Sequence, residues 1–63
     1  MKISEIYIAL MRGEKVTFSD WADYEFIYWC KENLTLMDES NETYSFEILD
    51  LEHGEASIYK DAV

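Results

Sequence analysis

The stretch Tyr24-Glu25-Phe26-Ile27-Tyr28-Trp29-Cys30 decides the fold. Aromatic and β-branched side chains dominate it, and these side chains favour a pleated sheet. In an extended strand one face would carry Glu25, Ile27 and Trp29, and the opposite face the remaining residues of the stretch. Because both faces hold large apolar groups, we predict a central strand, or a strand with one face covered by a partner.

A helix over Asp20–Asn33 is the alternative interpretation of the same region. Ser19 would cap this helix, and its apolar stripe would consist of Trp21, Tyr24, Ile27, Tyr28, Lys31 and Leu34. Short apolar runs fit both periods, so the alternative stays open at this point.

The N-terminal segment 3–12 has the spacing of one helical face, with apolar residues at Ile3, Ile6, Tyr7, Leu10 and Met11. We expect Ser4 to be the N-cap and Gly13 to follow the C-terminus. Ile3 and Ile8 would then form a hydrophobic staple at the start of this helix.

The remaining segments indicate short strands over 15–18, 34–37, 43–48 and 56–59, with turns at 19–23, 31–33 and 38–42. Residues 50–55 are expected to form a loop or one helical turn. The sequence therefore predicts an α+β fold, in which one helix precedes a small antiparallel sheet of four or five strands. Residues 1–63 are expected to form one domain.

Charge restricts the possible partners. The chain has 14 acidic and five basic residues, a formal net charge of −9, and aromatic residues make up 16% of it. Such a surface repels nucleic acid and anionic membrane, so we expect neither as a direct partner. The apolar content is too high for disorder, no stretch is long enough to span a bilayer, and no signal peptide is recognisable. With Cys30 as the single cysteine, a cytoplasmic protein is expected.

No motif indicates catalysis, a metal or a cofactor. His53 beside Glu52 and Glu55 is expected to be a solvated loop histidine, and Cys30 a buried structural cysteine. The acids of 38–42 lack the ligand spacing of a calcium loop. We therefore expect a protein that is not an enzyme.

The candidate partner-binding residues fall into two acidic groups and one aromatic group. The acids at the two turns would present negative charge to a basic groove, and the aromatic side chains would supply a desolvated centre. The candidates are Asp20, Asp23, Glu25, Asp38, Glu39, Glu42, Trp21, Tyr24 and Trp29. The competing interpretation is that the acids only keep an aromatic-rich domain soluble.

The order of motifs resembles that of very short phage proteins, a family containing the Thoeris anti-defence sponges. The matching residues are Gly13-Glu14-Lys15-Val16, then Trp21, then 24–29, with 50–59 as an acidic closing segment. The resemblance implies an SH3-like sheet or partial barrel, a homo-oligomer, and sequestration of a nucleotide immune signal. The family usually carries a basic residue between the Val and the Trp, whereas this chain has Thr17-Phe18-Ser19-Asp20 there.

Three functional hypotheses follow. The first is a phage-type inhibitor in the host cytoplasm, a partial nucleic-acid mimic that binds the basic surface of a nuclease or other bacterial defence enzyme. The second is an oligomeric sponge for a nucleotide signal. The third is a structural accessory protein that acts through self-association.

Overall fold

The computed structural model describes residues 1–60, so Asp61, the last acid of the chain, lies outside the described residues. A nine-residue helix precedes a five-stranded antiparallel sheet with strand order β4-β3-β2-β1-β5, and a second short helix separates β4 from β5. The elements are α1 (Ile3–Met11), β1 (Val16–Phe18), β2 (Ile27–Cys30), β3 (Thr35–Asp38), β4 (Thr43–Tyr44), α2 (Phe46–Asp50) and β5 (Ala56–Ile58).

The predicted α+β class and the central position of the aromatic strand are confirmed. Strand β2 lies between β1 and β3, and β5 returns to pair with the free side of β1. The sheet is not closed, which agrees with a partial barrel and is compatible with an SH3-like arrangement. The alternative helix over Asp20–Asn33 is wrong, because this segment forms a loop, β2 and a turn.

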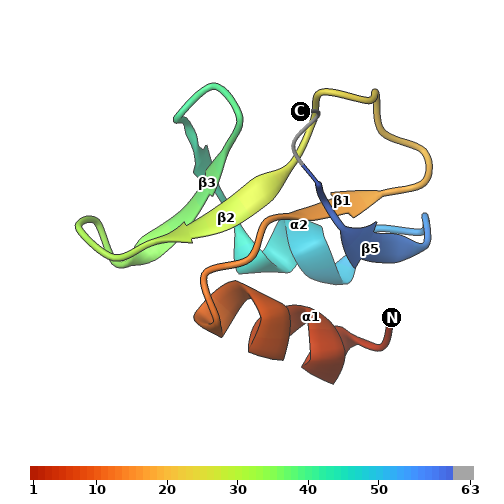
Figure 1. The fold of residues 1–63 in the computed structure, drawn as a ribbon, viewed down its shortest axis with the longest axis horizontal. Helices are drawn as coiled ribbons and strands as arrows, with labels where there is room; N and C mark the ends of the chain where they lie inside the picture. The colour runs from red at the N-terminus through yellow and green to blue at the C-terminus, as the bar shows by residue number, and fades with distance from the viewer. Residues whose placement is uncertain (61–63) are drawn as a thin grey trace.

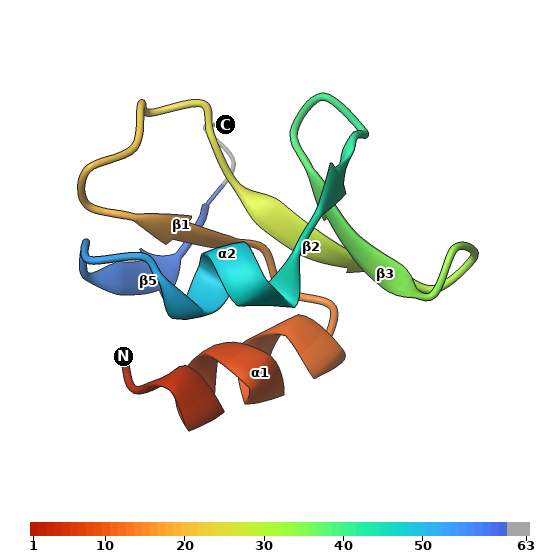
Figure 2. The ribbon, with the colours of Figure 1, turned by 180° about the vertical axis from the view of Figure 1, so that it is seen from behind.

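Both helices pack on the same side of the curved sheet. Figures 1 and 2 show α1 beneath the strands and α2 against the face that is hidden in Figure 1. The core between them consists of Ile6, Ala9, Leu10, Val16, Phe18, Ile27, Leu36, Leu49 and Ala56. Trp29 shares the inner face of β2 with Ile27, as the alternation of the strand predicts.

The N-cap of helix α1 lies two residues earlier in the chain than predicted. The cap is Lys2, whose backbone N–H donates to Oε1 of Glu5 at 2.8 Å, so Ser4 is not the cap. The expected staple is also wrong, because Ile3 is already the first helical residue and both it and Ile8 are exposed. Gly13 follows the helix with φ of +86°, as expected of a residue in this position.

The buried face of α1 is displaced from the predicted stripe. Ile6, Ala9 and Leu10 are buried, whereas Met11 is 57% exposed. The sequence pattern predicts Met11 on the core side, because Met11 follows Tyr7 by four residues and so falls on the same helical face. The buried flank of α1 carries Ile6, Ala9 and Leu10, and Met11 lies outside it, in solvent.

The segment 43–48 contains the main error in the prediction. Only Thr43 and Tyr44 form a strand, and helix α2 begins at Phe46. Ser45 caps this helix, because its Oγ accepts a hydrogen bond from the backbone N–H of Glu47 at 3.1 Å. The helix buries Leu49 in the core.

The other strands agree with prediction within a few residues. The aromatic strand begins at Ile27 rather than at Tyr24, and β3 begins at Thr35 rather than at Leu34. Leu34 has φ of 53° and is 74% exposed, which places it in the turn between β2 and β3. The predicted strands over 15–18 and 56–59 correspond to β1 and β5.

Candidate functional site

The loop between β1 and β2 and the turn between β3 and β4 lie at the same edge of the sheet. Ile27 pairs with Asp38, and the backbone N–H of Phe26 donates to Oε1 of Glu39 at 3.2 Å. Both connections rise on the same side of the sheet in Figures 1 and 2. Five of the six acids predicted from sequence therefore lie at one surface, here called the acidic edge: Asp23, Glu25, Asp38, Glu39 and Glu42.

Three carboxylates of the acidic edge hold its backbone in place. Glu25 Oε1 accepts from the N–H of Ala22 at 2.8 Å, which braces the β1–β2 loop. Asp38 Oδ1 accepts from the N–H groups of Ser40 at 2.8 Å and Glu42 at 3.1 Å, which braces the turn. With Glu39 on Phe26, these bonds make the charges of Glu25, Asp38 and Glu39 part of the local structure.

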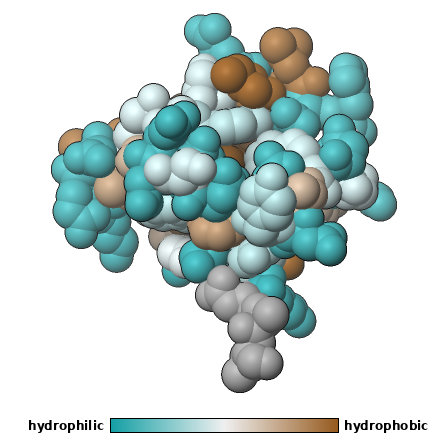
Figure 3. All heavy atoms as spheres, turned by 90° about the horizontal axis from the view of Figure 1, so that it is seen from above, coloured by the Kyte–Doolittle hydropathy of each residue, from teal (hydrophilic) through white to brown (hydrophobic). Residues whose placement is uncertain are grey.

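The other residues of this edge project into solvent. Asp23 and Glu42 are exposed, and Tyr24 between the acids is 68% exposed. Figure 3 looks onto this side of the molecule, where hydrophilic side chains prevail and apolar ones form separate patches. Asp23 and Glu42 are therefore the carboxylates of the edge that a partner can reach without disturbing the fold.

Trp21 is half-buried and packed against other side chains rather than exposed on the surface. Its ring packs against Phe18 at a centroid distance of 4.9 Å and against Tyr44 at 5.9 Å. Its indole Nε1–H donates to Oε1 of Glu52 at 3.1 Å, and the Tyr44 hydroxyl donates to Oε2 of the same carboxylate at 3.3 Å. Glu52 thus bridges two aromatic side chains from distant parts of the chain.

This bridge has an electrostatic consequence for Tyr44. Partial burial, the negative charge of Glu52, the hydrogen bond to Glu52 and the charge of Asp20 raise the pKa of the Tyr44 phenol above its usual value of 10.0. Asp20 is exposed, but its side chain lies against Gly54, where an added Cβ would collide with it. Asp20 therefore faces the Trp21–Tyr44–Glu52 cluster and is not counted with the acidic edge.

The three candidate aromatic residues do not form one patch. Trp29 packs on the inner face of β2 against the core, with Phe46 of α2 at a ring distance of 6.2 Å. Trp21 and Trp29 are half-buried, and among residues 1–60 no ring contact joins them to Tyr24. Only Tyr24 is an exposed aromatic side chain at the acidic edge.

A separate aromatic cluster covers part of the outer face. The rings of Phe26 and Tyr59 are 4.7 Å apart, Tyr28 lies 6.2 Å from Phe26, and Lys15 Nζ lies 4.6 Å above the Phe26 ring. The Tyr28 hydroxyl donates to Oδ1 of Asn41 at 2.7 Å, which ties the cluster to the β3–β4 turn. Phe26 follows Glu25 and Asn41 precedes Glu42 in the chain, so the cluster adjoins the acidic edge.

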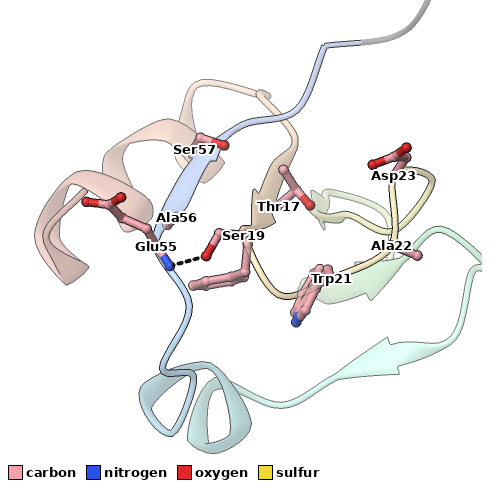
Figure 4. A pocket seen from close by; sticks show the side chains of 9 residues that line it. Thr17, Ser19, Trp21, Ala22, Asp23, Glu55, Ala56 and Ser57 are labelled. Atoms are coloured by element: carbon pink, nitrogen blue, oxygen red, sulfur yellow. Dashed lines mark hydrogen bonds between the residues drawn. The ribbon is translucent and has the colours of Figure 1, made fainter.

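A hollow of about 340 Å³ opens beneath the β1–β2 loop, and we call it the β1–β2 hollow. Its walls come from β1, the loop itself and β5 (Figure 4). The lining residues are Thr17, Phe18, Ser19, Trp21, Ala22, Asp23, Glu55, Ala56 and Ser57. The lining combines hydroxyls, two carboxylates and an indole, and it includes Asp23 of the acidic edge.

The other candidate residues carry less chemistry. His53 is exposed in the loop before β5, and Cys30 is half-buried rather than buried, with Sγ 3.5 Å from Oε2 of Glu32. Within residues 1–60, no group of three or more histidine, cysteine, aspartate or glutamate side chains is placed to hold a metal ion. No helix in that part of the chain is long and apolar enough to cross a membrane.

Sequence reasoning missed Glu52, Ser45 and the β1–β2 hollow. Ser45 had a detectable signal, a helix-capping residue followed by an acid at Glu47, where the helix dipole favours one. Glu52 had no local signal, because its two partners are 31 and eight residues away in the chain. The hollow arises only when β5 returns beside β1.

Comparisons with protein-family models, curated proteins and solved structures find no match to this chain. The resemblance to phage anti-defence proteins therefore stays a prediction.

Proposed function

We propose that this protein is a non-enzymatic inhibitor that binds a basic, nucleic-acid-binding surface of another protein through its acidic edge. The observation that carries the proposal is the convergence of two separate acidic turns at one end of the sheet, bonded through Glu39 and Phe26. A phage-type protein that acts on a bacterial nuclease or other defence enzyme in the host cytoplasm fits this chemistry.

The electrostatics favour such a partner. Negative charge gathered at one edge accelerates encounter with a basic groove, and it repels nucleic acid that competes for the same groove. The braced carboxylates of Glu25, Asp38 and Glu39 hold their charges in fixed positions, as a mimic of phosphates requires. The exposed side chains of Asp23 and Glu42 supply charge that is free to adjust to the partner.

A nucleotide signal is a less favourable ligand. Asp23 and Glu55 are among the nine residues that line the β1–β2 hollow, and none of the nine is basic. A second hollow, of about 410 Å³ between α1 and β5, contains Arg12 together with Glu5 and Glu14. Phosphate groups prefer arginine, lysine and backbone N–H donors, so the two linings support a cationic partner over an anionic one.

The proposal is tested by charge removal at two places. In the edge variant, Asp23→Asn and Glu42→Gln neutralise the exposed acids of the acidic edge. In the control variant, Glu32→Gln and Glu47→Gln remove the same charge from the β2–β3 turn and from α2. Association with a fluorescent arginine-rich peptide, a basic probe, is followed by stopped flow at low and at high salt.

The expected loss follows from Coulomb's law. Two unit charges about 10 Å from a cation contribute roughly 0.8 kcal/mol in water, so the edge variant should associate about fourfold more slowly at low salt. The difference should nearly vanish at high salt. Equal association rates for the edge and control variants would overturn the proposal. Lysate capture with the same two variants then identifies the basic protein that depends on the edge.

Self-association is a second candidate, supported by apolar side chains on the helices. Ile3, Ile8 and Met11 of α1 and Phe46 and Ile48 of α2 are exposed. Sedimentation velocity of a Met11→Gln, Ile48→Gln variant tests this candidate, with Leu34→Gln as the control for an exposed apolar residue elsewhere. An oligomer that persists in the helix variant, or a monomer in the unaltered protein, would contradict self-association through the helices.

A further inference from the structure

We propose that the β1–β2 hollow is a binding site for a single arginine side chain presented by the basic partner. The inference rests on the proposed function and adds the chemical group that the partner inserts. It is drawn from the shape, the lining and the position of the hollow, which adjoins the acidic edge through Asp23.

The lining supplies acceptors for a cation with several N–H groups. The Thr17 hydroxyl donates its proton to the carbonyl oxygen of Glu25 at 2.7 Å, which leaves its lone pairs as acceptors. Ser19 Oγ accepts from the N–H of Glu55 at 2.9 Å and keeps a second lone pair. With the carboxylate of Asp23 and the hydroxyl of Ser57, the walls offer oxygen atoms to a donor.

The side chains are arranged around the opening. In the view of Figure 4, Ser57, Thr17 and Asp23 follow one side of the hollow, and Ser19 and Trp21 follow the other. The Glu55 carboxylate points away from them in the same view. Asp23 is therefore the carboxylate placed to pair with an occupant, and the indole of Trp21 gives the hollow a flat apolar wall.

The hollow is at the small end of the range for ligand pockets, and its chemistry favours an arginine side chain. Binding pockets for small molecules range from roughly 300 to 1,000 Å³, and this hollow has a volume of about 340 Å³. Arginine suits it better than lysine, because a guanidinium is planar, stacks on aromatic rings and carries five N–H donors for several acceptors. A lysine ammonium has three donors and no flat face for the indole.

The direct test uses isotope-labelled protein and an arginine residue blocked at both ends. Blocked citrulline is the neutral control of the same shape, and blocked lysine is the test of the charged group. We expect arginine to shift the amide resonances of residues 17–23 and 55–57, with a Kd on the order of millimolar for so small a ligand. Citrulline should cause no such shifts.

Variants separate the hollow from general charge. Asp23→Asn should weaken arginine binding about tenfold, because it removes a charge-assisted hydrogen bond. Glu32→Gln removes the same charge from a distant turn and should leave the affinity unchanged. Ser57→Phe fills the hollow from an exposed position of β5 without altering the charge, and it should abolish the shifts.

The arginine-rich peptide then distinguishes failure of this inference from failure of the proposed function. Electrostatic attraction by the acidic edge increases the association rate, whereas an arginine side chain bound in the hollow lowers the dissociation rate. Ser57→Phe should therefore leave association unchanged and accelerate dissociation severalfold. If Ser57→Phe changes neither rate while the edge variant still slows association, the hollow is not the arginine site and the proposed function stands. Equal shifts with citrulline or lysine, or shifts spread over the whole acidic surface, would also overturn the arginine site.

Discussion

Removal of the Glu52 carboxylate tests whether one acid organises the region around the β1–β2 loop. Glu52→Ala breaks the hydrogen bonds from Trp21 Nε1 at 3.1 Å and from the Tyr44 hydroxyl at 3.3 Å. Both bonds are longer than the 2.7–2.9 Å of strong charge-assisted bonds, and Glu52 is half-buried. We therefore assign each bond about 1 kcal/mol, and the substitution should cost about 2 kcal/mol of unfolding free energy.

This cost is large for a domain of this size. At 0.05–0.15 kcal/mol per residue, a chain of 63 residues has an unfolding free energy of about 3–9 kcal/mol. A loss of 2 kcal/mol should lower the melting temperature by about 8–16 °C. Urea unfolding followed by tryptophan fluorescence measures the change directly, and Glu42→Gln is the control for loss of one exposed charge.

Glu52→Gln separates charge from hydrogen bonding. The amide oxygen still accepts from Trp21, and the amide nitrogen can donate to the Tyr44 hydroxyl, which reverses that bond. The Gln variant should therefore lose less than about 1 kcal/mol, and the pKa of Tyr44 should fall because the neighbouring charge has gone. The reasoning is refuted if Glu52→Ala is as stable as Glu42→Gln, or if the two Glu52 variants lose the same stability.

Three further perturbations test other parts of the structure. Ser45→Ala removes the cap of α2 and should cost about 1 kcal/mol in urea unfolding, with Ser40→Ala as the control; no difference between them would contradict the cap. Gly13→Ala places a Cβ at a φ of +86° and should cost about 1 kcal/mol, and equal or greater stability would exclude that conformation. Stability should decline above about pH 10, since folding raises the pKa of Tyr44 and the folded state holds that phenol proton more tightly. Tyr44→Phe should lessen the decline, and an identical pH profile would contradict it.

The secondary structure was predictable from sequence where the pattern of apolar and polar residues fits only one type of element. The two-faced aromatic strand indicated a central position, and β2 occupies it. The segment 43–48 had two solutions, because Tyr44, Phe46 and Ile48 alternate as in a strand while Ser45 and Glu47 begin a helix. Burial of Leu49 decides for the helix, and that burial depends on where α1 and the sheet leave space.

The candidate site was predictable in part. A tight connection between β2 and β3 forces the residues before Ile27 and after Asp38 to the same edge, so the meeting of the two acidic groups follows from hairpin geometry. The positions of the aromatic side chains cannot be predicted in the same way. Trp21 contacts Tyr44 and Glu52, which are far from it in the sequence and come close only in the folded chain. Composition alone gives no means of separating an exposed ring from a packed one.

The acidic residues therefore have two different roles, which the net charge alone does not distinguish. Glu25, Asp38, Glu39 and Glu52 each accept a hydrogen bond that holds a loop, a turn or a ring, whereas Asp23 and Glu42 are available to a partner. An amide keeps the acceptor oxygen and loses the charge, while alanine loses both. At a bracing position, the amide should thus preserve the fold and weaken attraction to a basic surface, and alanine should damage both. At Asp23 or Glu42 the two substitutions should have the same effect on attraction, with little effect on folding.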